Sequence, residues 1–120
     1  VHDHVHVVGG VLRPMKMNPH VKKEWVAALR SRQYKQGARY LCKSDRYNAF
    51  GVLFDACIVG DWTYDEHTDS WNVDNSGSLL PATIAEGVGL YLGDEFTIMT
   101  MNDVHSVTFK EIATWIERNL

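Results

Sequence analysis

The sequence lacks the features that place a chain in a membrane or around a structural metal. No run approaches the roughly 18 apolar residues of a membrane-spanning helix, and no basic segment followed by an apolar run opens the chain. Only two cysteines occur, Cys42 and Cys57, without the C-x-x-C spacing of zinc sites. A disulfide between them is compatible with their separation but not required by it. These absences favour a reduced cytoplasmic protein with no membrane contact.

Sequence motifs of common enzyme classes are also missing. The chain contains no G-x-x-x-x-G-K-[ST], G-x-G-x-x-G, H-E-x-x-H or G-x-S-x-G, which argues against the standard nucleotide, zinc-protease and serine-hydrolase sites. The nearest match to a calcium loop starts with Asn72 instead of aspartate and has Thr83 in place of the bidentate glutamate. We therefore expect neither a metal nor a cofactor, and we interpret the acidic stretch as a solvated hairpin.

Basic and acidic residues are unevenly distributed along the sequence, although the net charge is only −3. Residues 13–46 hold ten basic and two acidic side chains, whereas residues 47–120 hold two basic and twelve acidic ones. This division is compatible with a basic binding face, with an acidic one, or with two halves that neutralise each other across the fold.

The hydrophobic content of 45% is enough for one core, and 120 residues is a common size for a single domain. Asn18 is a good N-cap and Pro19 suits the first helical position, which predicts an amphipathic helix over residues 19–31. At the other end, Thr108 and Glu111 match a capping box, in which Glu111 returns to the cap N–H, and predict an amphipathic helix over residues 109–119.

Between these helices the pattern predicts shorter elements. We expect a hairpin from residues 39–42 and 47–50, a helix over 52–59 capped by Gly60, two strands near 62–66 and 70–73, and a helix over 82–87. Residues 96–101 are compatible with either a strand or a helix. The sum is a single α+β domain with a small antiparallel sheet and about four helices.

Residues 1–8 alternate apolar and polar side chains, which is typical of a strand, and Gly9 and Gly10 interrupt the pattern. His2, His4 and His6 would share one face of that strand, a pattern compatible with a metal. A histidine-rich terminus is more often foreign to the native domain. We therefore interpret residues 1–16 as a dispensable leader and residues 17–120 as the domain.

Several short motifs follow one another along the chain: Trp25-Val26-Ala27-Ala28-Leu29-Arg30-Ser31, Tyr34-Lys35-Gln36-Gly37, Gly51-Val52-Leu53, Leu80-Pro81, Asn102-Asp103, Phe109-Lys110-Glu111-Ile112-Ala113 and Ile116-Glu117. Their order resembles a group of small uncharacterised proteins encoded by phages, prophages and other mobile DNA. The resemblance spans Met17 to Leu120 and implies a natural start at Met17 and a setting in the bacterial cytosol, with no implied reaction. Similar proteins carry a Cys-Cys pair where Asn48 and Ala49 stand here, so thiol or metal chemistry is not carried over.

The only compact catalytic candidate is Asp103 with His105, which follow Asn102 before the last helix. Aspartate and histidine can form an acid–base pair. Asparagine and aspartate also favour turns, because their side chains bond to nearby backbone. A small enzyme using this pair is thus one alternative, and a structural turn is the other.

Two surfaces are candidates for binding. A basic stretch interleaves cations with an aromatic ring, which suits phosphate contact and base stacking, at Arg30, Arg32, Tyr34, Lys35 and Arg39. An acidic stretch carries Trp62 and Trp71 among carboxylates, which suits a basic host protein. The two surfaces can also meet in a homodimer. We favour a non-enzymatic accessory or protein-interaction protein of mobile-element origin, with a nucleic-acid-binding module as another alternative.

Overall fold

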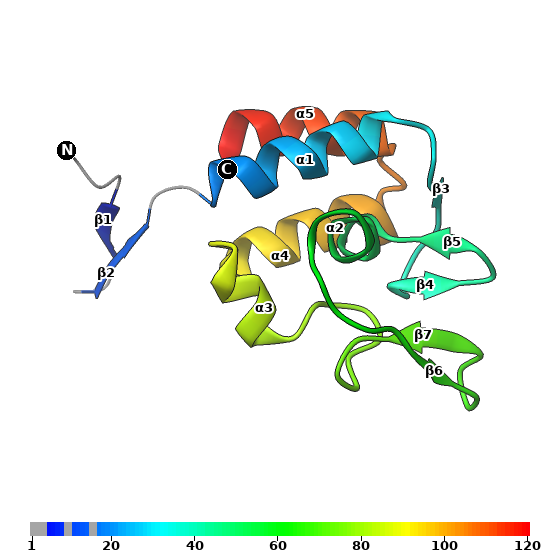
Figure 1. Cartoon of the computed structure of the whole chain (residues 1–120). Helices are drawn as coiled ribbons and strands as arrows, with labels where there is room; N and C mark the ends of the chain where they lie inside the picture. Colours follow the sequence, from blue (N-terminus) through cyan, green and yellow to red (C-terminus); the bar gives the residue numbers. More distant parts are fainter. Residues whose placement is uncertain (1–4, 9–10, 15–16) are drawn as a thin grey trace.

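A computed structural model of the protein describes residues 5–8, 11–14 and 17–120, with side chains from residue 17 onward. Within these residues, helices and a small sheet lie in separate regions, which confirms the predicted α+β fold (Figure 1). The helices are α1 (Pro19–Arg30), α2 (Ala49–Cys57), α3 (Ala82–Gly87), α4 (Leu92–Met99), the π-helical turn η1 (Thr100–Val104) and α5 (Phe109–Asn119). The strands are β1 (Val5–Val8), β2 (Val11–Pro14), β3 (Lys35–Gln36), β4 (Cys42–Lys43), β5 (Arg46–Tyr47), β6 (Thr63–Asp65) and β7 (Ser70–Asn72).

The main sheet has the strand order β3-β5-β4-β7-β6, with β3 parallel to β5 and the other neighbours antiparallel. The β4–β5 hairpin turns at Ser44 and Asp45, whose φ angles of 52° and 62° suit a tight two-residue turn. The predicted hairpin is confirmed, but its strands are shorter and closer to the turn than the predicted 39–42 and 47–50. The first is Cys42–Lys43, and the second ends at Tyr47, because Asn48 already caps the next helix. The second predicted strand pair is confirmed as β6 and β7.

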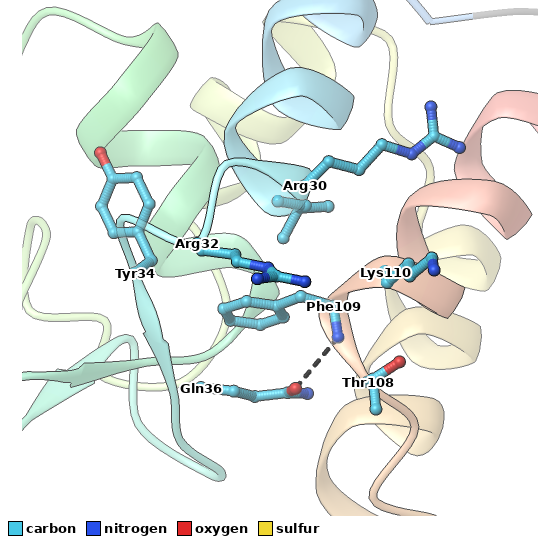
Figure 2. Close-up of a pocket in the computed structure, with 8 residues that line it drawn as sticks. Arg30, Arg32, Tyr34, Gln36, Thr108, Phe109 and Lys110 are labelled. Carbon is cyan, nitrogen blue, oxygen red and sulfur yellow. Dashed lines mark hydrogen bonds between the residues drawn. The ribbon is translucent and has the colours of Figure 1, made fainter.

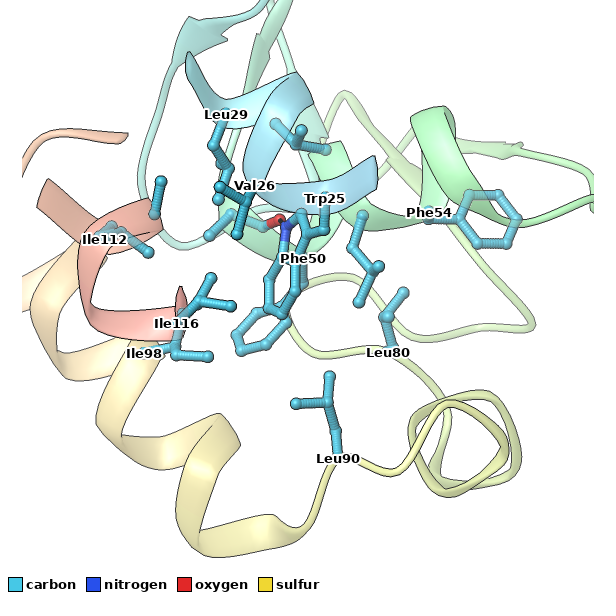
Figure 3. Close-up of a cluster of buried hydrophobic side chains, with 14 of the residues drawn as sticks. Trp25, Val26, Leu29, Phe50, Phe54, Leu80, Leu90, Ile98, Ile112 and Ile116 are labelled. Atoms are coloured by element: carbon cyan, nitrogen blue, oxygen red, sulfur yellow. Dashed lines mark hydrogen bonds between the residues drawn. The ribbon is translucent and has the colours of Figure 1, made fainter. Parts of the chain in front are cut away.

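The core lies where α1 packs against α5 and α2 (Figure 1). The fully buried Trp25 donates a hydrogen bond from Nε1 to the carbonyl oxygen of Ala49 at 2.9 Å, which ties α1 to the first turn of α2. Complete burial of one large apolar side chain contributes about 2 kcal/mol. Figure 3 shows the side chains that gather around Trp25, among them Val26, Leu29, Phe50, Ile98, Ile112 and Ile116.

Asn18 and Thr108 cap the N-terminal ends of α1 and α5, as predicted. Asn18 Oδ1 accepts hydrogen bonds from the backbone N–H groups of His20 and Val21 at 2.9 and 3.1 Å. Thr108 Oγ1 accepts from the N–H of Glu111 at 3.2 Å. The Glu111 carboxylate accepts from the Thr108 hydroxyl at 3.0 Å, whereas the capping box predicts that it accepts from the cap N–H.

Four further expectations meet the structure in different ways. The helix predicted over residues 52–59 is observed as α2 at Ala49–Cys57, and Gly60 does not cap it, because its C-cap is Ile58. A Cβ at Gly60 would lie 2.8 Å from the Phe54 ring, so close packing is what favours glycine there. The predicted helix over 82–87 is confirmed as α3, and residues 96–101 are helical, in α4 and η1. The predicted N-terminal strand is confirmed for β1, while His2, His4 and the side chain of His6 lie outside the described part of the chain.

Candidate functional site

Asp103 and His105 lie in the segment between α4 and α5. Asp103 Oδ1 accepts hydrogen bonds from the backbone N–H of Arg39 at 3.0 Å and from Nδ2 of Asn102 at 2.8 Å. The exposed His105 side chain makes no hydrogen bond to the side chains described from residue 17 onward. Asp103 therefore joins two loops, and the structure does not place His105 as its hydrogen-bonded partner.

Gln36 and Asn102 come from separate motifs of the sequence and meet in one polar network. Gln36 Nε2 donates to Asn102 Oδ1 at 3.1 Å and to the carbonyl oxygen of Val107 at 2.8 Å, and its Oε1 accepts from the Phe109 N–H at 3.0 Å. Asn102 Nδ2 also donates to the carbonyl oxygen of Gly37 at 2.8 Å. These residues fix the start of α5 against β3. The two sequence motifs that contain them are therefore explained by their role in the fold.

The two cysteines are free thiols. Burial raises the pKa of Cys42, and it raises the pKa of Cys57 to about 11. Both thiols are therefore protonated at neutral pH, whereas a cysteine nucleophile needs a depressed pKa.

Trp62, one of the predicted binding residues, packs against the core. Its ring centroid lies 5.1 Å from that of Phe54 and 6.2 Å from that of Tyr47. Its Nε1 donates to Asp55 Oδ1 at 3.2 Å, and the Tyr34 hydroxyl donates to the other carboxylate oxygen at 2.8 Å. Burial and then this hydrogen bond raise the pKa of Tyr34. Trp62 and the Tyr34 hydroxyl are thus already engaged within the fold.

Trp71, in contrast, lies on the surface beside a second aromatic residue. Trp71 and Tyr64 are directly opposite each other on β7 and β6, with ring centroids 5.3 Å apart. Their exposed fractions are 42% and 48%, although large aromatic residues are usually well buried. The Tyr64 hydroxyl donates to Asp69, which raises the pKa of Tyr64. This bond holds one ring of the pair in place.

Carboxylates occur on the same hairpin as this aromatic pair. Glu66 and Asp69 are exposed in the turn between β6 and β7, and Asp65 is half-buried at the end of β6. A surface hollow of about 570 Å³ next to Tyr64 is lined in part by Asp65 and Glu66. We call the set Tyr64, Asp65, Glu66, Asp69 and Trp71 the hairpin surface.

The basic and acidic halves of the sequence scarcely neutralise each other in the fold. Arg30 Nη1 lies 3.1 Å from Glu117 Oε2, and this is the only salt bridge between the two halves within residues 17–120. The interaction raises the pKa of Arg30 and lowers that of Glu117, chiefly through the hydrogen bonds between them. Within these residues the opposite charges of the two halves are therefore largely not paired in salt bridges.

A cationic pocket of about 460 Å³ lies between the end of α1 and the start of α5 (Figure 2). The structure brings Arg30, Arg32 and Tyr34 of the basic stretch to this pocket, together with Phe109 and Lys110 of α5. Leu29, Gln36 and Thr108 complete the lining. We call this set of eight residues the α1–α5 pocket.

The other two predicted basic residues lie elsewhere. Lys35 is exposed on β3 and does not line the α1–α5 pocket, and Arg39 lines a separate hollow that includes Asp65. Sequence reasoning missed Lys110 because it is 71 or more residues away from every residue of the basic stretch, as the numbering shows. It also missed the pairing of Tyr64 with Trp71, which the strand pattern around residues 62–73 makes possible to find.

Comparisons with known proteins give one match. No helix in the described part of the chain is long and apolar enough to cross a membrane. No curated protein and no solved structure matches the chain. Residues 17–120 match a family described as a domain of unknown function (DUF8296). Because this match covers most of the 120 residues, the chain belongs to the DUF8296 family.

Proposed function

We propose that this chain is a non-enzymatic interaction protein of mobile-element origin, working in the bacterial cytoplasm, whose hairpin surface binds a basic host protein. The observation that carries the proposal is the exposed Tyr64–Trp71 pair on an acidic hairpin, with Asp69 bonded to Tyr64. The resemblance of its motifs to proteins encoded by mobile DNA supports the setting.

Aromatic residues of this kind supply much of the energy of protein interfaces. Tyrosine and tryptophan are enriched among the residues whose truncation costs a complex more than about 2 kcal/mol. Trp71 and Tyr64 each leave close to half of their surface in contact with water, so a partner that covers them removes apolar area from solvent. Their cross-strand packing, with Tyr64 bonded to Asp69, limits the conformational entropy lost on binding.

The carboxylates indicate the charge of the partner. Asp65, Glu66 and Asp69 are not salt-bridged to any residue in the range 17–120, where the pairs are Arg30–Glu117 and His20–Glu24. The hollow beside Tyr64 places two of these carboxylates around a space open to a partner side chain. Arginine or lysine side chains fit this arrangement, and complementary charge speeds association.

Catalysis has less support in the geometry. Asp103 Oδ1 accepts hydrogen bonds from Arg39 and Asn102 instead of His105, and the thiols have raised pKa values. An exposed aromatic and acidic surface is more typical of binding than of a reaction, which needs a site that excludes water.

Nuclear magnetic resonance on ¹⁵N-labelled protein tests the proposal through the indole N–H signals of the four tryptophans. On titration with a short arginine-rich peptide, we expect the Trp71 signal to shift and the signal of the fully buried Trp25 to stay in place. The shift should weaken as salt rises, because exposed charges are screened.

Phe96→Ala is the matched control for Trp71→Ala, because Phe96 is 48% exposed, close to the 42% of Trp71, but lies on α4. Peptide affinity should fall in Trp71→Ala and stay unchanged in Phe96→Ala. Equal affinities in the two variants, or a Trp71 signal that does not move, contradict the proposal. Sedimentation of the protein alone at low and high salt separates partner binding from self-association.

A further inference from the structure

The α1–α5 pocket presents hydrogen-bond donors that the fold leaves unused. Arg30 is bonded to Glu117, and the Gln36 amide is bonded to Asn102, Val107 and Phe109. In contrast, the side chains of Arg32 and Lys110 form no salt bridge within residues 17–120. The two cations come from different elements and line the same cavity (Figure 2).

The polar groups that are already bonded narrow the choice of ligand. Thr108 Oγ1 is engaged with Glu111, and the Tyr34 hydroxyl with Asp55. No carboxylate lines this pocket. The charged groups left to a ligand are therefore donors, so the ligand must supply acceptors and negative charge.

Arg32 is placed in the pocket at a conformational cost. It follows the C-cap of α1 with a φ of 65°, a left-handed conformation in which glycine is usual and long side chains are uncommon. Among positive-φ residues other than glycine in the described chain, only Arg32 and Arg39 are not Ser, Asp or Asn. Helix termination alone is better served by glycine at this position.

We propose that the α1–α5 pocket binds a phosphate monoester with a compact organic body, with Arg32 and Lys110 holding the phosphate. Two cations match the charge of −1.5 to −2 that a phosphate monoester carries near pH 7, roughly twice that of a carboxylate. Arginine provides a fork of donors for phosphate oxygens, and lysine adds a point charge.

The remainder of the cavity suits the body of such a molecule. A volume of about 460 Å³ lies within the usual range of small-molecule sites, and Leu29, Tyr34 and Phe109 give it apolar walls. Phe109 is only 7% exposed, so its ring is not free to stack successive bases of a nucleic acid strand. A single small ester therefore fits better than a strand. The proposal shares no residue with the hairpin surface, and either can fail without the other.

The test is calorimetric titration of the full chain with AMP, inorganic phosphate, adenosine and a single-stranded oligonucleotide. AMP should bind, phosphate should compete with it, and adenosine should bind at least tenfold more weakly, since it lacks the charged group. Arg32→Gly and Lys110→Gln should each weaken AMP binding at least tenfold.

Arg39→Gly is the matched control, because Arg39 is also an arginine at positive φ, 73°, but lines a different hollow. It should bind AMP like the unmodified chain. The melting temperatures of both glycine variants should be equal to or above that of the unmodified chain, which separates loss of binding from loss of folding. Equal weakening by Arg39→Gly, equal binding of AMP and adenosine, or binding of the oligonucleotide alone overturns the proposal.

Discussion

Asp103 and Asn102 hold the segment before α5 against the chain that follows β3. Asp103 Oδ1 accepts two hydrogen bonds, and one of them comes from the backbone of Arg39. Loss of these bonds removes the Asp103 acceptor from the Arg39 backbone N–H and leaves Asn102 Nδ2 with its bond to the Gly37 carbonyl oxygen. His105, two residues further on, is exposed and contributes no such bond within the described chain.

Separate alanine substitutions distinguish the structural role of Asp103 from a catalytic one. Asp103→Ala should lower the free energy of unfolding by about 1–2 kcal/mol, because two hydrogen bonds are lost. His105→Ala should change it by less than about 0.5 kcal/mol, as is usual at exposed positions. Urea denaturation measures both. Equal effects of the two substitutions contradict this account.

Glu95 gives a prediction about pH. This glutamate is 6% exposed on α4, and burial, followed by the nearby charges of Asp94 and Glu86, raises its pKa. The folded state therefore binds the Glu95 proton more tightly than the unfolded chain does. Protonated Glu95 therefore stabilises the folded state. This stabilisation is complete below the ordinary pKa of glutamate and is lost as pH rises through the raised pKa of Glu95.

Glu95→Gln keeps the side chain neutral at every pH. At pH 7 the variant should be more stable than the unmodified chain by about 1 kcal/mol, the usual size of a single-residue effect, and the gain should shrink toward about pH 4. Urea midpoints at the two pH values measure this, with exposed Glu66→Gln as control. A loss of stability at pH 7 would show that the Glu95 carboxylate has a favourable charged partner.

At the scale of elements, α2 is held against the loop before β4 by a close backbone approach. A Cβ on Gly51, in the first turn of α2, would lie 1.9 Å from the carbonyl oxygen of Leu41. On α4, a Cβ on Gly93 would meet nothing within 4 Å. The fold therefore has no room for a side chain at Gly51, whereas it has room for one at Gly93.

Gly51→Ala should destabilise the protein by about 3 kcal/mol, because the backbone must shift to admit the methyl group. Gly93→Ala should stabilise it by about 0.5–1 kcal/mol, since alanine loses less entropy in a helix. Thermal unfolding of the two variants checks both signs. A tolerated Gly51→Ala would mean that α2 does not lie this close to Leu41.

The helices show how much of the fold could be predicted from the sequence. Helices α1 and α5 follow from the side-chain caps of Asn18 and Thr108 and from an apolar stripe, which are local signals. The bounds of α2 were harder to predict, because Asn48 caps the helix in the middle of an apolar run. The closeness of Gly51 to Leu41 depends on tertiary packing, which no local pattern records.

The candidate sites were predictable to a lesser degree. Trp71 was found from its acidic surroundings, but Trp62 has the same surroundings and turns inward onto Phe54. Arg32 was found from the local charge, whereas its pairing with Lys110 requires α1 and α5 to be adjacent. Sequence composition thus identifies charged stretches, and only the fold decides which of their residues share a surface.

At the scale of the whole molecule, the charge division remains largely unpaired. Arg30–Glu117 is the only salt bridge between the two halves within residues 17–120, and the α1–α5 pocket and the hairpin surface carry opposite charge. A molecule of this kind attracts partners of either sign, each at its own surface and with a strength that falls as salt rises.

The most direct measurement of the central claim is differential affinity capture from bacterial lysate by the unmodified chain, Trp71→Ala and Phe96→Ala. We predict that at low salt the unmodified chain and Phe96→Ala retain the same basic protein, identified by mass spectrometry, and that Trp71→Ala loses it. High salt should release that protein from both baits. Retention of the same proteins by all three chains, or of none beyond the background, would contradict the proposal that the hairpin surface binds a basic host protein.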